Sequence, residues 1–153
     1  MRDKKFIVTE ELGKLAKWLR ILGYDTVYHA KEDIPAIVVQ ALREGRIILT
    51  RSSTVANYKG VQAVVVKHDL VEDQMDQVMN KLGLSVEEAS LFQICVECNT
   101  ALEVIPKEDV KGKIPEYVYE TQNEFKRCPQ CDKIFWKGTH WDMVKKWLDK
   151  RQK

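Results

Sequence analysis

The sequence predicts an α/β fold, a parallel sheet wound with helices, followed by a second segment of a different kind. Over residues 1–90, short runs rich in β-branched residues alternate with stretches whose apolar residues recur at helical spacing. That alternation is typical of a parallel sheet covered by helices. From residue 91 onward the alternation stops, and all four cysteines of the chain lie there.

The alternation begins with a predicted strand at residues 5–9 (KFIVT). A helix that ends at Gly23 follows, because apolar residues recur three and four positions apart: Leu12, Leu15, Ala16, Leu19 and Leu22. Residues 25–29 form the second predicted strand. The next helix has Pro35 in its first turn and ends at Gly45, and its apolar stripe is Ile34, Ile37, Val38, Ala41 and Leu42.

Two further strands are predicted at residues 46–50 (RIILT) and 63–67 (AVVVK). Both runs are nearly continuously apolar, as expected for parallel strands that are covered on both faces. A third helix is indicated by the stripe Met75, Val78, Met79 and Leu82.

Composition and charge narrow the class of protein. The chain is 44% hydrophobic and 31% charged, which suits a globular domain and excludes a disordered or collagen-like chain. No apolar run reaches the roughly 18 residues of a membrane-spanning helix, and the N-terminus lacks the apolar core of a signal peptide. We therefore expect a cytoplasmic protein. Residues 126–153 hold 9 basic and 3 acidic side chains, which indicates either a nucleic-acid surface or a solvated helix with a charged tail.

The four cysteines form two CxxC pairs, Cys95 with Cys98 and Cys128 with Cys131. Such pairs fit two tight turns whose thiolates point at one centre, which is the ligand set of a tetrahedral Zn²⁺ site. Because the protein supplies all four ligands, we expect the zinc to be structural. Disulfides and unbound structural cysteines are the alternatives, and an intracellular setting disfavours the disulfides.

Four segments occur in an order that resembles one known family: LGKLAKWLRILGYDT (12–26), RIILTR (46–51), CVECN (95–99) and CPQCDKIFWKGTHW (128–141). Together they resemble the Mut-seven C-terminal RNase domain family, over about residues 5–142. The resemblance implies a PIN-like domain joined to a zinc ribbon and a role in RNA metabolism. We therefore expect a PIN-like α/β domain at 1–88, a zinc ribbon at 89–142 and a basic C-terminal helix or tail at 143–153.

The resemblance also implies a carboxylate site for Mg²⁺ or Mn²⁺ at the C-terminal ends of the strands, where the family hydrolyses RNA. Two family carboxylates are replaced here, by Thr9 after the first strand and by Ser52 after the third. The remaining catalytic candidates are Asp25, Asp33 and Glu10, with Glu11 as the alternative to Glu10. From the residues alone, Asp25 also suits a turn and Asp33 a helix N-cap.

Three functions follow from these observations. The first is an RNA-binding protein with weakened or lost catalysis, whose candidate RNA-binding residues are Lys14, Lys17, Arg20, Arg51, Lys133, Lys137, His140 and Trp141. The second is an active Mg²⁺- or Mn²⁺-dependent ribonuclease with a reduced carboxylate set. The third is a protein-binding scaffold in a ribosomal or RNA-processing complex.

Overall fold

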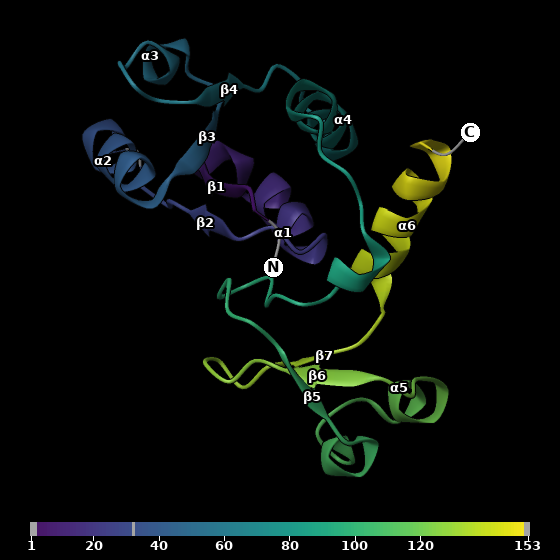
Figure 1. The fold of residues 1–153 in the computed structure, drawn as a ribbon. Coiled ribbons are helices and arrows are strands. Elements are labelled where there is room, and N and C mark those ends of the chain that lie inside the picture. Colours follow the sequence, from purple (N-terminus) through teal and green to yellow (C-terminus); the bar gives the residue numbers. More distant parts are fainter. Residues whose placement is uncertain (1–2, 32, 152–153) are drawn as a thin grey trace. The chain divides into compact units, whose positions relative to one another are not determined.

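The computed structural model describes residues 3–31 and 33–151 of the chain, without the side chains of residues 139 and 140. The chain divides into two compact units, Met1–Asn99 and Thr100–Lys153 (Figure 1). The placement of the zinc ribbon at 89–142 stays a prediction.

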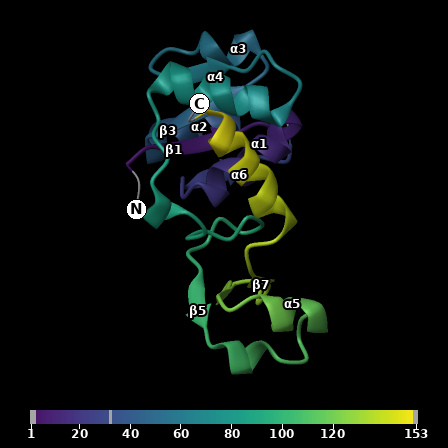
Figure 2. The same cartoon turned by 90° about the vertical axis from the view of Figure 1, so that its right-hand side faces the viewer.

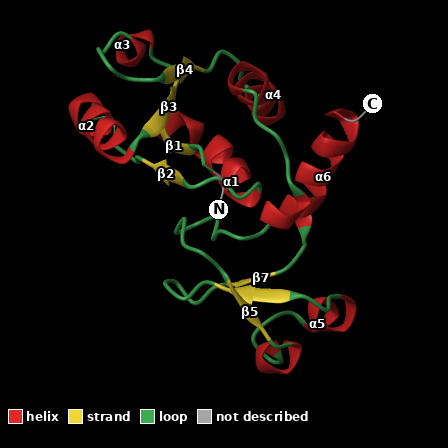
Figure 3. Ribbon diagram, viewed as in Figure 1, coloured by secondary structure: helices red, strands yellow, loops and turns green. Residues whose placement is uncertain are grey.

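The first unit is built on a four-stranded sheet (Figure 3). Its strands are β1 (Lys5–Val8), β2 (Thr26–Tyr28), β3 (Arg46–Thr50) and β4 (Ala63–Val65), in the order β2-β1-β3-β4. All three neighbouring pairs are parallel. The predicted fold class, a parallel sheet wound with helices, is therefore confirmed. Since β2 and β3 lie on opposite sides of β1, the direction of winding reverses between β1 and β3, which is where open α/β sheets bind ligands.

Four α-helices of the first unit cover this sheet (Figure 1). They are α1 (Gly13–Ile21), α2 (Ile34–Glu44), α3 (Ser53–Ala56) and α4 (Val71–Leu82), with short 3-10 turns η1 (Glu10–Leu12) and η2 (Glu88–Ser90). α1 contacts α4, whereas α2 packs against β1 and β3. The predicted apolar stripe of α2 provides buried residues to that second contact, where they meet strand residues in one cluster: Ile7, Ile37, Val38, Ala41, Ile48 and Val55.

Gly23 is required where the chain leaves α1. Its φ is +92°, a conformation that residues with a Cβ rarely adopt. A Cβ at this position would also collide with the backbone carbonyl of Ser90. Next to this close approach, the backbone N–H of Phe92 donates to the carbonyl of Ile21 at 3.0 Å. The segment after α4 is thus held tightly against the end of α1.

The second unit contains an antiparallel sheet of three short strands, β5 (Glu103–Ile105), β6 (Phe125–Arg127) and β7 (Ile134–Phe135). Its helices are η3 (Lys107–Val110), α5 (Glu116–Thr121) and α6 (Thr139–Arg151), and α6 is drawn as one uninterrupted helix (Figure 2). Val110, Val118 and Phe125 form a small core, and Trp136 packs against it in a T-shaped contact with Phe125. None of the helices described for residues 3–31 and 33–151 is long and apolar enough to cross a membrane.

Candidate functional site

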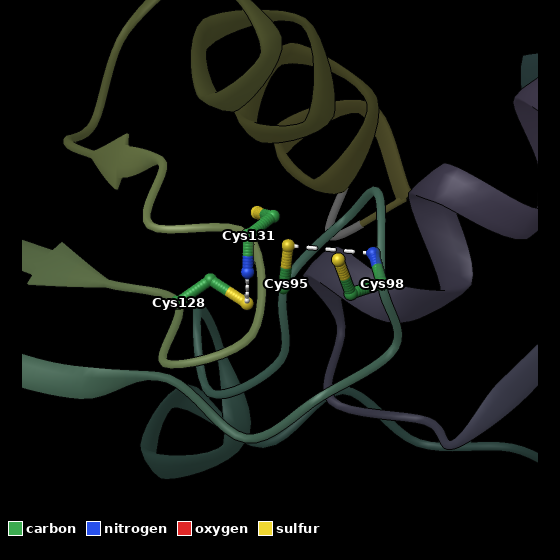
Figure 4. Close-up of side chains that lie close together, drawn as sticks. All are labelled: Cys95, Cys98, Cys128 and Cys131. Carbon is green, nitrogen blue, oxygen red and sulfur yellow. Dashed lines mark hydrogen bonds between the residues drawn. The ribbon is translucent and has the colours of Figure 1, made fainter.

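The four cysteine sulfurs converge in space (Figure 4). All four Sγ atoms lie within 4.8 Å of one another. Zinc–sulfur bonds of about 2.3 Å in a tetrahedron require sulfur–sulfur separations of roughly 3.8 Å, so a small contraction would close the set around one ion. Among the described residues, no other group of three or more His, Cys, Asp or Glu side chains meets this distance. The four cysteines can therefore hold a metal ion.

Each CxxC pair is folded into the same tight turn. The N–H of Cys98 donates to Sγ of Cys95 at 3.4 Å, and the N–H of Cys131 donates to Sγ of Cys128 at 3.5 Å. The following residues, Asn99 and Asp132, both have positive φ, +60° and +65°. Asn and Asp tolerate this left-handed conformation better than other residues with a Cβ. We call these turns the first knuckle (95–99) and the second knuckle (128–132).

Arg20 lies in the interior and not on an RNA-binding surface. Its side chain is 7% exposed, and Nε donates to the carbonyl of Thr26 at 2.9 Å. One terminal nitrogen donates to the carbonyl of Val96, inside the first knuckle, at 2.6 Å. These bonds occupy the guanidinium with backbone oxygens and give Arg20 a structural role, whereas a contact of Arg20 with RNA stays a prediction.

The surroundings of Arg20 are electrostatically unusual. Burial lowers the pKa of Arg20, since the charged form loses water. The negative groups around it favour the charged form, and the largest of these contributions come from Cys95, then Glu97 and Cys98. A buried cation thus lies within electrostatic range of two of the four sulfurs.

Asp25 lies at the amino end of β2, where it pairs with neighbouring side chains. Its Oδ1 accepts from Arg46 at 2.8 Å and from Nδ2 of Asn99 at 2.6 Å. Burial alone would raise the pKa of Asp25, but the bonds from Arg46 and Asn99 outweigh it and hold the pKa below its ordinary value. Asp33 and Glu10 follow the carboxyl ends of their strands, so the structure does not bring Asp25 together with them. A catalytic role of Asp25 stays a prediction, and the contacts with Arg46 and Asn99 assign it a structural one.

At the carboxyl edge, between β1 and β3, the prominent carboxylate belongs to Glu11. Thr9, which is 4% exposed, donates its hydroxyl to Oε1 of Glu11 at 2.8 Å. The N–H of Arg51 donates to the same oxygen at 3.2 Å. Burial raises the pKa of Glu11, but hydrogen bonds from its own backbone, Thr9 and Arg51 outweigh burial and hold it below its usual value. Glu10, the first candidate from the sequence, meets Tyr28 through its backbone, since its carbonyl accepts from the Tyr28 hydroxyl at 2.6 Å.

The other candidates at this edge serve local structure. Asp33 is the N-cap of α2 and accepts from the N–H of Ala36 at 3.1 Å. Ser52 precedes α3, and its N–H donates to the hydroxyl of Thr50 at 3.0 Å. Arg51 pairs with Asp69 at 2.9 Å. No group of three carboxylates is gathered at this edge among the described residues.

The other basic candidates lie on two surfaces. Lys14 and Lys17 are exposed on α1, and Lys17 is 3.5 Å from Glu97. In the second unit, Lys133 lies over the ring of Phe135 at 5.8 Å and Lys137 over Trp141 at 5.3 Å. The side chain of His140 lies outside the described residues.

One half-buried lysine adds to the basic face of the second unit. Lys126 pairs with Phe135 across β6 and β7. Burial lowers the pKa of Lys126, and the nearby charge of Lys137 lowers it further, whereas Glu124 opposes both. Basic and aromatic side chains therefore occur together here: Lys126, Lys133, Phe135, Lys137 and Trp141.

Comparison with known proteins agrees with this geometry. A search of the curated proteins and a search of the solved structures found no match. The comparison with protein families matches residues 4–148 to the Mut7-C RNAse domain. The matched span includes the whole parallel sheet and all four cysteines. The resemblance carried by the four sequence motifs is thereby confirmed, and the chain belongs to the Mut7-C RNAse domain family.

Proposed function

We propose that this chain is an RNA-binding protein on a PIN-like ribonuclease scaffold, with weakened or lost hydrolysis. The observation that carries the proposal is the pair of neutral residues, Thr9 and Ser52, at the carboxyl ends of β1 and β3. A hydroxyl is a poor substitute for a carboxylate on Mg²⁺ or Mn²⁺. The Thr9 hydroxyl is also engaged in a hydrogen bond, because it donates to Glu11 at 2.8 Å.

RNA affinity would come from cationic and aromatic side chains. In the second unit, Lys133 and Lys137 each lie over an aromatic ring, Phe135 and Trp141. Lysines contact phosphates, and aromatic faces stack on bases of single-stranded RNA without strong sequence preference. The family's ribonuclease character supports RNA as the partner.

We further propose that the metal held by the four cysteines is structural Zn²⁺. Four thiolates are a soft ligand set that suits zinc and disfavours Mg²⁺ or Mn²⁺. With four protein ligands, no coordination position is left for a water that attacks substrate. The zinc would therefore stabilise the fold, and catalysis, where it occurs, would belong to the carboxyl edge of the sheet.

The decisive test restores the replaced carboxylates. In Thr9→Asp/Ser52→Asp, a new carboxylate would lie beside Glu11, so the metal-free variant should be less stable than wild type and regain stability with Mn²⁺. Ser52 precedes α3, where Asp is a favourable N-cap, so that change should not disturb the helix. Thermal unfolding with and without Mn²⁺ measures the effect.

A matched control adds the same two negative charges on α3, at positions other than Thr9 and Ser52. Ser53→Asp/Thr54→Asp places two carboxylates on exposed positions and should show no Mn²⁺-dependent recovery. The restored variant should also gain Mn²⁺-dependent cleavage of a single-stranded RNA oligonucleotide, while wild type binds that oligonucleotide with little cleavage. Efficient Mn²⁺-dependent cleavage by wild type, abolished in Asp33→Asn, would overturn the proposal.

An active metal-dependent ribonuclease is the second candidate, and Glu11 favours it. Its carboxylate lies where the winding of the sheet reverses, and hydrogen bonds hold its pKa low, so it is ionised at neutral pH. In that case Glu11→Gln should remove wild-type cleavage, whereas the neighbouring Glu10→Gln should leave it intact. Absence of both RNA binding and cleavage would favour a protein-binding scaffold in a ribosomal or RNA-processing complex.

A further inference from the structure

We propose that Asn99 and Arg20 position the first knuckle on the parallel-sheet unit, so that metal binding and the stability of that unit form one linked equilibrium. The inference rests on the metal site proposed above. Both residues lie within Met1–Asn99, and both would position the metal ligands without ligating the metal themselves.

Asn99 fits both polar groups that it meets at the start of β2. Its Nδ2 donates to the carboxylate of Asp25 at 2.6 Å, and its Oδ1 accepts from the N–H of Thr26 at 2.9 Å. An amide is the side chain that supplies a donor and an acceptor side by side. Because one partner only accepts and the other only donates, the orientation of the amide is determined.

The backbone of Asn99 closes the first knuckle. Its N–H donates to the carbonyl of Cys95 at 2.9 Å, and its φ of +60° turns the chain directly after Cys98. The same residue therefore completes the turn that presents two sulfurs and attaches that turn to β2. A shift of β2 would be transmitted to the sulfurs through this residue.

Arg20 provides a second, independent attachment. It spans from the carbonyl of Thr26 to that of Val96, which lies between Cys95 and Cys98 in the chain. The residue is almost fully buried. Four thiolates around a divalent ion leave a net negative charge, which a buried guanidinium nearby would stabilise. Arg20 thus acts on the sulfurs through position and charge, without ligating the metal.

Thermodynamic linkage follows from these two attachments. A metal that binds the folded chain and not the unfolded one stabilises the folded state in proportion to the logarithm of its concentration. Since the first knuckle is bonded to β2 and α1, this stabilisation should reach the parallel sheet. By reciprocity, weakening the attachment at β2 should weaken metal binding by the same factor.

The test compares the equivalent residues of the two knuckles. Asn99→Gly keeps the left-handed turn and removes the side chain, and Asp132→Gly does the same in the second knuckle, where the exposed carboxylate accepts from Arg127 at 3.1 Å. Zinc affinity is measured by competition with a chromophoric chelator. We expect Asn99→Gly to lower it about 10–100-fold, as loss of outer-shell partners typically does, and Asp132→Gly to change it less than about 3-fold.

Hydrogen exchange of the β2 amides in zinc-loaded protein supplies the second readout. Protection of Val27 should fall in Asn99→Gly and stay at the wild-type value in Asp132→Gly; Thr26 is left out, because its N–H donates directly to the side chain that Asn99→Gly removes. Equal zinc affinities and equal β2 protection in the two variants would overturn the inference while leaving the metal site intact. Wild type that takes up no zinc would instead remove the metal site itself, and the inference with it.

Exchanging the donor and the acceptor between positions 25 and 99 separates a specific loss of positioning from general destabilisation of the variant. Asn99→Asp would set two carboxylates against each other and should lose affinity as Asn99→Gly does. Asp25→Asn/Asn99→Asp restores a donor facing an acceptor, because the new amide at position 25 can donate to the new carboxylate at position 99. This double variant should recover zinc affinity at least threefold over Asn99→Asp. Failure of the double variant to exceed the single one would contradict a positioning role.

Discussion

The carboxylate of Asp25 is held between a guanidinium and an amide at the start of β2. The side chains of Arg46 and Asp25 are 9% and 23% exposed, so the pair is largely removed from water. Breaking a buried pair by removing one partner costs more than an exposed pair contributes, because the remaining charge loses its compensation. This position therefore tolerates substitution poorly for structural reasons, with no part in catalysis needed to explain it.

We expect Asp25→Asn to lower the free energy of unfolding by about 1–3 kcal/mol at pH 7, the usual worth of hydrogen bonds to a charged group. The pKa of Asp25 is lowered in the fold, so its stabilising effect is present above the unfolded-state pKa of about 3.9 and is lost as pH falls through the lower, folded-state pKa. The difference between wild type and variant should therefore shrink toward acid.

Urea unfolding of both proteins at neutral pH and near the acid limit measures this difference. Wild type and variant are compared at each pH in the same zinc concentration, so that release of metal by acid affects both proteins alike. A difference that stays constant with pH would show that the amide, and not the ionised carboxylate, is what the fold requires at this position.

The sequence allowed the position of Asp25 to be predicted, but not the contacts of Arg20. Arg20 is a candidate RNA-binding residue from the sequence, and its burial is not predicted, because arginine is seldom fully buried without partners. Its partner Val96 is 76 positions away in the chain, and no local pattern predicts that contact. Asp25 is different, because it precedes a β-rich run, and residues before parallel strands lie at the amino edge. That signal was available in the sequence.

At the scale of elements, the strands and helices with strong periodicity were predicted from the sequence. The stripes of α1, α2 and α4 and the apolar runs of β1 and β3 lie where expected. The short elements η1, α3 and β5 were not predicted, because three or four residues carry too little periodicity to distinguish a turn from a strand. Glu11 is on η1, and this explains why the sequence could not decide between Glu10 and Glu11.

The antiparallel sheet of the second unit allows a prediction about charge. Lys133→Glu/Lys137→Glu should weaken binding of single-stranded RNA for all sequences and reduce the slope of log affinity against log salt by about 1.4, since each lost phosphate contact on a single strand contributes roughly 0.7. Titrations at several salt concentrations measure both quantities.

A pair of lysines elsewhere in the same unit provides the control. Lys107→Glu/Lys111→Glu makes the same change in net charge, and Lys107 also lies over an aromatic ring, that of Tyr119 at 4.9 Å. Equal losses of affinity in the two double variants would indicate a general effect of net charge, and the RNA surface would then have to be sought on α1 or α6.

At the scale of the whole molecule, we expect one zinc ion per chain and loss of structure when it is removed. The cluster of Val110, Val118 and Phe125 in the second unit is small, so metal binding should supply much of the stability of that unit. Mass spectrometry under native conditions and circular dichroism before and after chelation test this. Cys128→Ser should resemble the chelated protein, and a chelated wild type with unchanged spectra would contradict the prediction.

The contacts at the start of β2 also determine the order in which the chain can fold. Asn99 and Asp25 are 74 positions apart, whereas the last helix of the parallel-sheet unit, α4, ends at Leu82. During synthesis at about 5–20 residues per second, the sheet and its helices would exist for roughly 1–3 s before Asn99 is made. During that interval Asp25 lacks its bond from Asn99, and Arg20 lacks the carbonyl of Val96 until the chain reaches residue 96, so the nascent chain passes through a stage in which the amino edge of the sheet is incompletely bonded.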